Sequence, residues 1–550
     1  MPTFYLDDQP VDFKQGETLL QAADRAGIYI PRYCYHPGLK ITAQCRMCLV
    51  EITDMGNGRG MPRLQASCAT PAAENMRISI TSEKALNAQK TVNEFQLVNH
   101  PLDCPICDQA GECDLQDISF LYGTGRSEMN YEKRVSGNRD VGTFLMLERN
   151  RCIQCSRCER FSRDLVGTHD FAVFNRSHEV SFDTYGDHRI VHRFQGNLAD
   201  LCPVGAITQR DWRFRKRAWK LKKTPGVCTT CSTGCNITLD SHQNHIYRIS
   251  PRENLQVNRW WLCDEGRINF RGLNYHPGSS GPGAGPGKKT PRLEEPQLKA
   301  RGKARDGGWD GVLEALAPLL KEVAAAKGSV AALADTHATN EELFLLKTLL
   351  AEGFGSDKLF FPLQKGKAEL RAPAGLEDTF LYSLINTDKS PNTAGAQALG
   401  LKGLDGPDAL KGALGGKVKI MLVLGSPWED DPIAGDISTL ADLVIYLGVG
   451  GNAWSKTADV VLPGFTHAEK YGSFVNRNNL VQRIRPAISP PPQARDQVRT
   501  LCSLLGALDR EANHADGRDV LAALGAAEGP FKGLNWEALG DGGMPLPGKG

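Results

Sequence analysis

The first residues alternate short apolar runs with turn signals. The stretches "TFYL" (3–6) and "VDF" (11–13) predict strands, and "DDQP" (7–10) between them predicts a turn. A helix is expected from about Thr18 to Ala26, ended by Gly27. The chain is therefore expected to begin with two strands and a helix, followed by a loop that contains cysteine.

A different pattern marks the second half of the chain. In "WDGVLEALAPLLKEVAAAK" (309–327) apolar residues recur with i, i+3, i+4 spacing, which predicts an amphipathic helix. "SVAALA" (329–334) and "KIMLVLG" (419–425) are continuous apolar runs typical of buried parallel strands, and "LADLVIYLG" (440–448) predicts another. Helices that alternate with short apolar strands predict a doubly wound α/β domain.

Composition narrows the class of protein. A chain of 550 residues, 41% of them hydrophobic, is long enough for about three to five domains. Lys and Arg number 65 and Asp and Glu 63, a formal charge of +2, so no overall field recruits nucleic acid or an anionic membrane. The start "MPTFYLDDQP" has neither the basic and apolar regions of a secretory signal nor the character of a transit peptide, and we expect a cytoplasmic chain. The most apolar window, "VKIMLVLG", is far shorter than the roughly 20 residues that span a bilayer.

The cysteines divide the chain into two halves. Fifteen of the sixteen precede residue 264, and Cys502 stands alone. A cytoplasmic chain of this size is an improbable disulfide framework because the reducing pool keeps thiols free. Metal ligation is therefore the expected role of the first fifteen.

The first group of cysteines, site A, follows the predicted strands and helix. That layout is typical of plant-type [2Fe–2S] ferredoxins, which space their ligands as C-x4-C-x2-C with a distant fourth. Here ten residues separate the first two cysteines, which we interpret as a longer loop, and the tight pair is kept. A zinc knuckle is the alternative, but it requires a second CxxC pair. The predicted ligands are Cys34, Cys45, Cys48 and Cys68.

Site B lies in "HPLDCPICDQAGEC" (100–113), which has three cysteines and no free cysteine nearby. One helical turn or a tight loop can bring His100 to them. A lone histidine is more often a satisfied core or surface residue, but three cysteines without a fourth ligand reverse that expectation. We predict a [4Fe–4S] cluster held by His100, Cys104, Cys107 and Cys113, in which neutral imidazole replaces a thiolate and raises the reduction potential.

Site C begins in "RCIQCSRCERFSRDL" and ends in "ADLCPVGAIT". Bacterial two-cluster ferredoxins repeat C-x2-C-x2-C-x3-C-P twice, and the fourth cysteine of each run ligates the cluster of the other run. Ser162 occupies the fourth position of the first run, and the leading positions of the second run hold His192, Gln195 and Leu198. One complete [4Fe–4S] set is therefore expected, with Pro203 after its last member, and His192 is expected to be no ligand. The predicted ligands are Cys152, Cys155, Cys158 and Cys202.

Site D has the spacing C-x2-C-x3-C-x27-C, in "GVCTTCSTGCNITL" and "RWWLCDEGR". This spacing favours another [4Fe–4S] cluster, with zinc as the alternative, and Gly234 and Gly266 are expected to permit close backbone approach to the cluster. The predicted ligands are Cys228, Cys231, Cys235 and Cys263.

The order of these four sites resembles the large iron–sulfur subunit (75 kDa type) of bacterial NADH-quinone oxidoreductase, respiratory complex I. The resemblance covers residues 1 to about 277 and rests on the four ligand motifs. It implies one [2Fe–2S] and three [4Fe–4S] clusters, the first three on the electron path from NADH towards quinone and the last off that path. It also implies, as partners in this translocase, a flavin-bearing NADH-oxidising subunit as donor and a downstream iron–sulfur subunit as acceptor, at the cytoplasmic face of a bacterial inner membrane.

The second half resembles the molybdopterin oxidoreductases through "THATNEELFLLKTLL" (336–350) and "ADVVLPGFTHAEKYGSFVNRNNLVQR" (458–483). No Cys lies between 264 and 501, and about 240 residues are too few for the several lobes that enclose a paired pterin in that family, so we expect no molybdenum or tungsten centre. No nicotinamide or flavin fingerprint is present, and we expect no substrate-converting site and no catalytic residue in this chain.

The expected architecture is multidomain, α+β followed by α/β. The predicted domains are a β-grasp [2Fe–2S] ferredoxin module (1–80), a helical one-histidine three-cysteine module (81–140), a bacterial-ferredoxin-like module (141–220), a molybdopterin-oxidoreductase-type [4Fe–4S] module (221–277), a linker (278–308) and a shortened molybdopterin-oxidoreductase-like α/β domain (309–550). The linker prediction rests on a run rich in Gly, Pro and Lys.

One basic segment and two other functional classes remain. "RDWRFRKRAWKLKK" (210–223) holds eight basic residues and three aromatics; it could bind single-stranded nucleic acid, but a strap over a neighbouring surface is favoured.

The chain could also be the iron–sulfur subunit of a formate dehydrogenase or an NAD-linked hydrogenase, or a zinc-rich interaction protein, which would be colourless.

Overall fold

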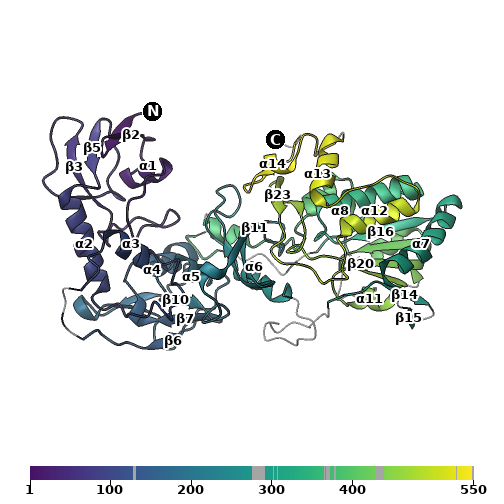
Figure 1. Cartoon of the computed structure of the whole chain (residues 1–550), viewed down its shortest axis with the longest axis horizontal. Helices are drawn as coiled ribbons and strands as arrows, with labels where there is room; N and C mark the ends of the chain where they lie inside the picture. Colours follow the sequence, from purple (N-terminus) through teal and green to yellow (C-terminus); the bar gives the residue numbers. More distant parts are fainter. Residues whose placement is uncertain are drawn as a thin grey trace. The chain divides into compact units, whose positions relative to one another are not determined.

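The structure is a computed structural model. It describes residues 1–127, 130, 132–274, 292–300, 303–305, 307–364, 366, 372–376, 379–427, 439–527 and 529–547. The chain divides into two compact units (Figure 1). The N-terminal unit comprises Met1–Leu221 and Arg371–Leu381, and the C-terminal unit comprises Lys222–Leu370 and Tyr382–Gly550.

The N-terminal unit begins with a five-stranded sheet in the order β2-β1-β5-β3-β4. Its strands are β1 (Thr3–Leu6), β2 (Gln9–Asp12), β3 (Leu49–Met55), β4 (Gln65–Ala66) and β5 (Met76–Ser79). β1 runs antiparallel to β2 and parallel to β5. The two predicted strands are confirmed, although the second begins two residues earlier than expected.

Helix α1 (Leu19–Arg25) begins and ends where the sequence predicts. Thr18 and Gln21 form a capping box, in which each side chain bonds the backbone N–H of the other. Gly27 has a φ of +77°, the left-handed conformation that ends a helix at low cost for glycine. The apolar face of α1 packs on the sheet, through Leu19, Leu20, Ala22 and Ala23 against Phe4, Leu6, Val11, Ile52 and Ile78.

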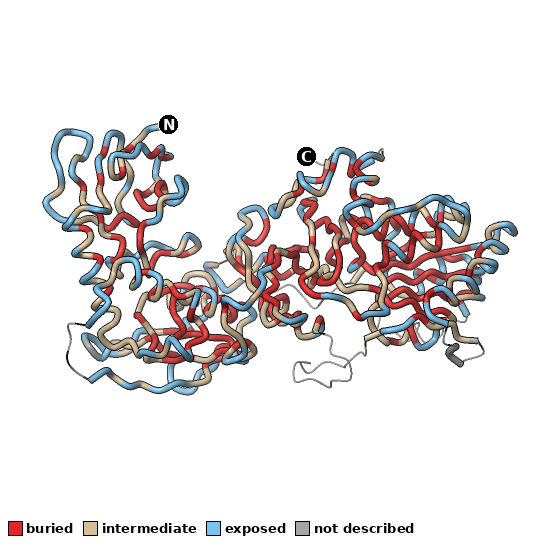
Figure 2. Tube along the Cα trace, viewed as in Figure 1, coloured by how far each residue is buried: buried red, intermediate tan, exposed pale blue. Residues whose placement is uncertain are grey.

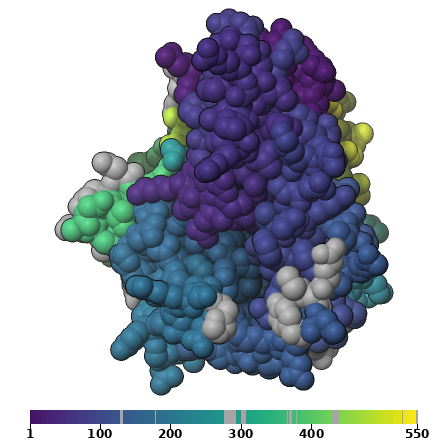
Figure 3. Space-filling model, turned by 90° about the vertical axis from the view of Figure 1, so that its left-hand side faces the viewer, coloured from purple at the N-terminus to yellow at the C-terminus, as the bar shows by residue number. Residues whose placement is uncertain are grey.

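The rest of the N-terminal unit consists of short elements joined by long loops. Residues 1–120 and residues 140–220 occupy different parts of its surface (Figure 3). The helices are α2 (Glu83–Leu97), α3 (Asp114–Tyr122), α4 (Arg157–Arg160) and α5 (Asn197–Leu201), with the single-turn helices η1 (Arg149–Arg151) and η3 (Ser177–Glu179) and a π-helical turn, η2 (Phe161–Val166). The strands are β6 (Asn138–Asp140), β7 (Leu145–Glu148), β8 (Ala172–Phe174), β9 (Ser181–Asp183) and β10 (Ile207–Gln209).

The C-terminal unit begins with an antiparallel sheet in the order β11-β12-β13, followed by a short helix. These elements are β11 (Lys222–Val227), β12 (Asn236–His242), β13 (His245–Pro251) and α6 (Asp264–Ile268), and η5 (Asn269–Gly272) continues the helix.

An eight-stranded sheet, β15-β14-β21-β20-β19-β16-β17-β18, forms the centre of the C-terminal unit. Its strands are β14 (Gln297–Ala300), β15 (Lys303–Arg305), β16 (Val330–Ala334), β17 (Leu359–Pro362), β18 (Lys402–Leu404), β19 (Val418–Leu424), β20 (Ala441–Gly448) and β21 (Val460–Pro463). The six from β16 to β21 are parallel. Numbered along the chain, they lie in the order 3-2-1-4-5-6, so the predicted doubly wound sheet is confirmed.

Both faces of this sheet are covered, which explains the continuous apolar runs in its strands. Alternate residues of β16 belong to different cores. Ala332 and Ala334 pack with α7 (Gly308–Ala325), α8 (Asn340–Thr348) and α12 (Gln497–Ala507), whereas Ala331 and Leu333 pack with α10 (Pro407–Leu414) and α11 (Ala453–Thr457). The strands are accordingly buried along most of their length (Figure 2).

The remaining elements of this unit are mostly helices. They are α7 (Gly308–Ala325), α8 (Asn340–Thr348), η6 (Leu349–Gly353), η7 (Phe380–Leu384), α9 (Thr393–Ala398), α10 (Pro407–Leu414), α11 (Ala453–Thr457), α12 (Gln497–Ala507), α13 (Gly517–Ala526) and α14 (Trp536–Leu539), with strands β22 (Gly472–Val475), β23 (Leu480–Ile484) and β24 (Met544–Pro545).

The predicted linker, 278–308, needs a correction at its C-terminal end. Residues 275–291 lie outside the described residues. β14 and β15 form a hairpin that pairs antiparallel with β21, and Arg292 makes a buried ion pair of 2.6 Å with Glu469. The α/β domain therefore begins before residue 309, because backbone hydrogen bonding to a free sheet edge recruits a segment that composition alone marks as loop.

Candidate metal centres

The four predicted ligands of site A lie on the long loop after α1 and just after β4. The Cys34 N–H points at the Cys45 sulfur at 3.4 Å. A hydrogen bond with Cys45 is the main cause that lowers the pKa of Cys34, and a hydrogen bond with Cys68 likewise lowers the pKa of Cys48. Each of the two thiol pairs thus favours one thiolate, the form that binds metal.

Site B is a small cavity lined by all four of its predicted ligands. His100 follows α2, and Cys113 is the N-cap residue of α3. The cavity is lined by His100, Asp103, Cys104, Cys107, Ala110, Cys113, Gln116, Arg151 and Gly205. The sequence motif is therefore brought together as predicted.

The imidazole of His100 is prepared to act as a ligand. Its Nδ1 is buried and has no hydrogen-bond partner among the described residues. Burial, and then Lys133 and Arg151, lower the pKa of His100 to about 4. The ring is therefore neutral at physiological pH, which is the form that coordinates metal. An orphaned buried nitrogen beside three thiols fits a metal or cluster at this position.

Site C is an apolar cavity. Cys152 and Cys155 stand before α4, Cys158 lies within it, and Cys202 follows α5. All four cysteines line the cavity with Leu147, Ile153, Phe171, Phe182, Val204 and other residues. Burial raises the pKa of Cys152 to about 12 and that of Cys202 to about 11. Without bound metal these thiols are protonated, so ligation would release protons.

The positions of the two ferredoxin runs that lack cysteine are occupied by ordinary packing. Ser162 is fully buried and donates to the Glu159 carbonyl at 3.1 Å. His192 lies 3.4 Å from Asp170, and burial lowers its pKa to about 4. Leu198 is a core residue. The expectation that His192 is no ligand remains a prediction, and its contact with Asp170 supports it.

Site D lies where β11 turns into β12, together with the start of α6. The Cys228 N–H donates to the Cys235 carbonyl at 2.8 Å, which closes the turn, and Cys263 caps α6 by accepting from the Gly266 N–H at 3.5 Å. A β-carbon at Gly266 would stand 2.7 Å from the Cys228 sulfur, so this glycine permits the close approach of that predicted ligand. At Gly234 the reason differs, because its φ is +61° and a β-carbon would meet Asn476.

Sites A, B and C share one hydrophobic core within the N-terminal unit. Its buried members are Tyr33, Met47, Cys113, Leu115, Ile118, Ile153, Val204 and Ala206, packed with Cys45, Cys152, Cys155 and Cys202. Polar contacts reinforce it: the Gln44 side chain donates to the Gln154 carbonyl at 3.0 Å, and the Asp114 N–H donates to the Pro203 carbonyl at 3.0 Å. Site C therefore contacts both of the other sites.

Sequence reasoning missed three residues around these sites. Arg151 is buried in the wall of site B and donates to Asp103 at 3.0 Å. Arg157 and Arg160 are buried beside sites A and C. Each arginine lies within two residues of a ligand cysteine in "RCIQCSRCER", but charged residues are usually expected at the surface.

The basic segment 210–223 lies partly over site B. Arg217 donates to the Cys107 carbonyl at 2.8 Å, and Arg210 pairs with Asp140 at 2.8 Å. The Trp219 ring lies against Gly111, where a β-carbon would stand 2.6 Å from it. The prediction of a strap over a neighbouring surface is confirmed.

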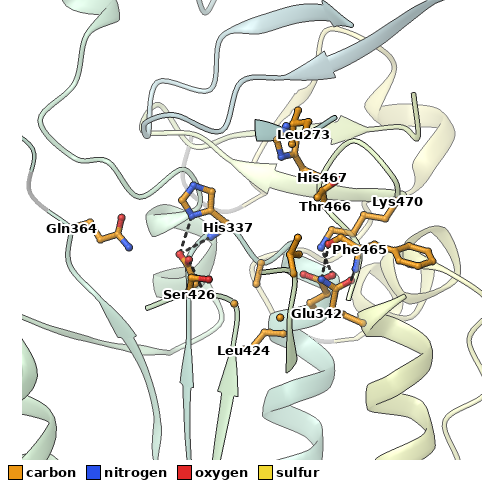
Figure 4. Close-up of a pocket in the computed structure, with 16 residues that line it drawn as sticks. Leu273, His337, Glu342, Gln364, Leu424, Ser426, Phe465, Thr466, His467 and Lys470 are labelled. Atoms are coloured by element: carbon orange, nitrogen blue, oxygen red, sulfur yellow. Dashed lines mark hydrogen bonds and ion pairs between the residues drawn. The ribbon is translucent and has the colours of Figure 1, made fainter. Parts of the chain in front are cut away.

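A separate cavity of about 720 Å³ lies at the carboxyl ends of the parallel strands in the C-terminal unit (Figure 4). Residues that follow β16, β19, β20 and β21 line it, among them Asp335, Ser426, Val449 and His467. β16 and β19 are strands 1 and 4 of the doubly wound order, so the cavity is at the switch point where such sheets bind ligands.

The cations of this cavity already have partners or are neutral. Burial lowers the pKa of His337, but Asp335 at 3.0 Å outweighs it, and the net shift is upward. Lys470 forms a buried ion pair with Glu342 at 2.5 Å. Burial lowers the pKa of His467 to about 3, so this ring is neutral. Among the described lining residues, no unpaired cation faces a ligand.

No group of three or more His, Cys, Asp or Glu side chains in the described part of the chain is arranged to hold a single metal ion. The predicted ligands of sites B and C line one cavity each, and those of site A form the pairs Cys34–Cys45 and Cys48–Cys68.

Comparison with known families agrees with this arrangement of sites. Residues 1–83 match the 2Fe-2S iron-sulfur cluster binding domain, 89–128 the NADH-ubiquinone oxidoreductase-G iron-sulfur binding region, and 142–208 the ferredoxin-like domain of NADH-quinone oxidoreductase subunit 3. Residues 221–274 match the molybdopterin oxidoreductase Fe4S4 domain, and 380–507 match molybdopterin oxidoreductase. The fold and these sites define a multidomain iron–sulfur protein.

Individual relatives specify the family. The mitochondrial NADH-ubiquinone oxidoreductase 78 kDa subunit of Candida albicans is 30% identical over an alignment of 628 positions, gaps included, which covers 94% of this chain and 84% of that protein. The NADH-quinone oxidoreductase G subunit of Rickettsia bellii is 37% identical over 345 residues, 63% of this chain and 47% of that protein. The chain belongs to the family of NADH-quinone oxidoreductase G subunits and their 75 and 78 kDa counterparts.

The coverage of relatives is uneven. The chain spans about half the length of the Rickettsia bellii protein and of the 75 kDa subunit of Reclinomonas americana, which is 36% identical over 66% of this chain. Among solved structures, a NAD+-reducing [NiFe]-hydrogenase in the H2-reduced state matches with 29% identity over 40% of this chain and 91% of that chain, at a TM-score of 0.36.

Proposed function

We propose that this chain is the electron-transferring iron–sulfur subunit of an NADH-quinone oxidoreductase. It would receive electrons from a flavin-bearing NADH-oxidising subunit and deliver them to a downstream iron–sulfur subunit, towards quinone. The observation that carries this proposal is the single core that joins sites A, B and C, because three ligand sets packed together form a path for electrons.

The assignment of clusters follows the ligand sets. Site A is proposed to hold a [2Fe–2S] cluster in a β-grasp module, and sites B, C and D one [4Fe–4S] cluster each. Bound clusters of these types accept and release single electrons. The residues of the chain hold the ligands and exclude water, as the apolar lining of site C and the burial of all four cysteines of site D indicate.

The α/β domain is proposed to be a scaffold without a molybdenum or tungsten centre. The cavity at its switch point supports this proposal, because a pterin nucleotide carries phosphates and each cation that lines the cavity is paired or neutral. "ADVVLPGFTHAEKYGSFVN" would then persist because β21 and β22 complete the core.

The proposed location is the cytoplasmic face of a bacterial inner membrane, held there by partner subunits. No helix in the described ranges is long and apolar enough to cross a membrane. Docking through the other subunits of the hydrophilic arm would therefore supply the membrane association.

Two measurements on the purified chain test this function. Iron and acid-labile sulfide assays with visible absorption and EPR spectra should show one [2Fe–2S] and three [4Fe–4S] clusters; a colourless zinc protein would overturn the proposal. The chain alone should not oxidise NADH with an artificial electron acceptor, and oxidation by the isolated chain would place the substrate site here instead of in a partner.

A further inference from the structure

Two arginines are buried where sites A and C meet. Arg157 and Arg160 are the first and last residues of α4, the helix that contains Cys158, and their exposed fractions are 8% and 1%. A guanidinium remains charged at any physiological pH and is almost never fully buried without a partner that carries negative charge. The bonds of these two side chains therefore need an explanation.

Arg160 bonds the backbone of both cluster loops. Its guanidinium donates to the carbonyl of Cys34, a predicted ligand of site A, and to the carbonyl of Lys40 at 2.5 Å. It also donates to the carbonyl of Cys155, a predicted ligand of site C, at 3.4 Å, and to that of Ser156 at 3.3 Å. One side chain thus ties together segments that lie more than 100 positions apart in the sequence.

Arg157 extends this connection to the third site. It donates to the Tyr35 carbonyl at 2.9 Å and to the Leu201 carbonyl at 3.1 Å, and its guanidinium lies 3.6 Å from the Asp114 carboxylate. Tyr35 follows Cys34, Leu201 precedes Cys202, and Asp114 follows Cys113. Arg157 therefore contacts a neighbour of one ligand in each of sites A, B and C.

Nearby carboxylates leave this positive charge largely uncompensated. Glu159 and Asp164 pair instead with Arg163, at 2.5 Å and 2.9 Å. Among the described residues no carboxylate makes an ion pair with Arg160, and Asp114, the partner of Arg157, is itself 44% exposed. Two positive charges are thus held in the interior, with backbone carbonyls as their main partners.

We propose that Arg157 and Arg160 form a cationic bridge that raises the reduction potentials of sites A and C and fixes the separation between them. This inference rests on the proposed function. An added electron makes either site more negative, and a buried positive charge in surroundings of low dielectric constant stabilises the reduced form. When one electron moves from site A to site C, site A is oxidised and site C is reduced, and the arginines exchange no proton.

The contacts predict unequal effects on the two sites. Arg160 bonds the Cys34 carbonyl closely and the Cys155 carbonyl only at 3.4 Å, so its charge should stabilise an electron on site A more than one on site C. These arginines are positioning residues, because their contacts are with the loops that hold the ligands.

The test is an EPR-monitored redox titration of the full cluster-containing chain, in the wild type and in Arg160→Met, Arg160→Lys and Arg157→Met. Arg163→Met is the matched control, because Arg163 lies three residues further along, is 41% exposed, and pairs with Glu159 and Asp164 instead of with the cluster loops. A pulsed-EPR distance between the reduced clusters of sites A and C reports their separation. Iron and sulfide content separates this test from that of the proposed function, since it shows whether clusters are present at all.

We expect Arg160→Met to lower the potential of site A, to lower that of site C less, and to leave site D unchanged. Arg160→Lys keeps the charge but cannot span the four carbonyls that Arg160 bonds, so the potential should stay near the wild-type value while the distance distribution broadens. Cluster-loaded Arg160→Met with wild-type potentials overturns the proposal. If Arg160→Met folds but binds no clusters, the other two variants decide. Wild-type potentials and distances in both Arg157→Met and Arg160→Lys would then overturn the proposal.

Discussion

Gly205 lies so close to Cys107 that a β-carbon at position 205 would stand 2.2 Å from the cysteine sulfur. Gly205 belongs to the loop after Cys202 of site C, whereas Cys107 is a predicted ligand of site B. The loop of one site thus forms part of the wall of the next, and only a residue without a side chain permits it.

Gly205→Ala should therefore displace Cys107 and prevent site B from assembling. We expect the loss of one [4Fe–4S] signal and of about four irons per chain, with site A retained, measured by EPR and iron analysis. Gly412→Ala is the control, because Gly412 lies within α10 and a β-carbon there would meet nothing within 4 Å beyond the neighbouring backbone of its own helix. A full complement of iron in Gly205→Ala would contradict this account of site B.

His100 gives a second prediction. His100→Ala should remove one cluster signal from the reduced spectrum, because the cavity then offers three donors. His100→Cys should keep the cluster at a lower reduction potential, since a thiolate adds negative charge. EPR-monitored titration distinguishes the two variants, and His192→Ala is the matched control, being a buried histidine that contacts Asp170. An unchanged spectrum in His100→Ala would show that the residue is no ligand.

The buried pair of Lys470 and Glu342 should matter for stability alone. Both side chains are almost completely buried, so Lys470→Met leaves a buried carboxylate without its cation and should cost about 3–5 kcal/mol of folding free energy. Lys470→Met combined with Glu342→Gln should recover much of that loss. Calorimetric unfolding of the cluster-containing chain measures both effects.

The control for this pair is Lys419→Met. Lys419 and Asp442 form an exposed pair at 2.9 Å, which should contribute little to stability because water and salt screen it. A stability loss in Lys470→Met no larger than that of the control would contradict the prediction, as would loss of the cluster signals of sites A to C.

His467 predicts a dependence of stability on pH. Its pKa is about 3 in the folded chain against the ordinary value of 6.5, so the unfolded chain binds the extra proton between these values. Stability should therefore fall as pH drops from about 6.5 towards 3, and be unaffected by this group above about pH 7. At pH 5 the loss is at most about 2 kcal/mol, and less because the ring faces a water-accessible cavity.

His467→Gln should remove that part of the pH dependence. Between pH 7.5 and pH 5 the wild type should lose the stability that His467 contributes, and the variant should not. If the variant is the less stable protein at neutral pH, the two unfolding temperatures should therefore differ less at pH 5 than at pH 7.5. Parallel pH profiles for the two proteins would contradict the shifted pKa.

Metal analysis addresses the α/β domain. The intact protein should contain iron in quantity and no stoichiometric molybdenum or tungsten, as measured by mass spectrometry of the purified chain. Either metal together with a bound pterin would contradict the scaffold proposal and favour a formate dehydrogenase.

Short-range patterns in the sequence were sufficient to predict several elements of the fold and the grouping of candidate ligands. The spacing of "HPLDCPICDQAGEC" was sufficient to group His100 with three cysteines because a ligand set within 14 residues needs only one turn and one helix start to assemble. β16 and β19 were predictable because strands buried on both faces consist of apolar residues throughout. In these cases the determinant lies within a few positions of the feature that it specifies.

Tertiary structure decided whatever depends on residues far apart in the chain. Nothing in the local sequence shows that Arg160 is buried, because its partners Lys40 and Cys34 lie 120 and 126 positions away. The segment that forms the β14–β15 hairpin has the composition of a linker. Only its hydrogen bonds to the edge of β21 show that it belongs to the sheet. The sequence shows that Lys470 and Glu342 are present but not that they form an ion pair. They meet only after the sheet has brought α8 and the loop after β21 together. Spacing along the chain fixes which atoms can be neighbours within a turn, whereas burial and charge pairing depend on packing between distant segments.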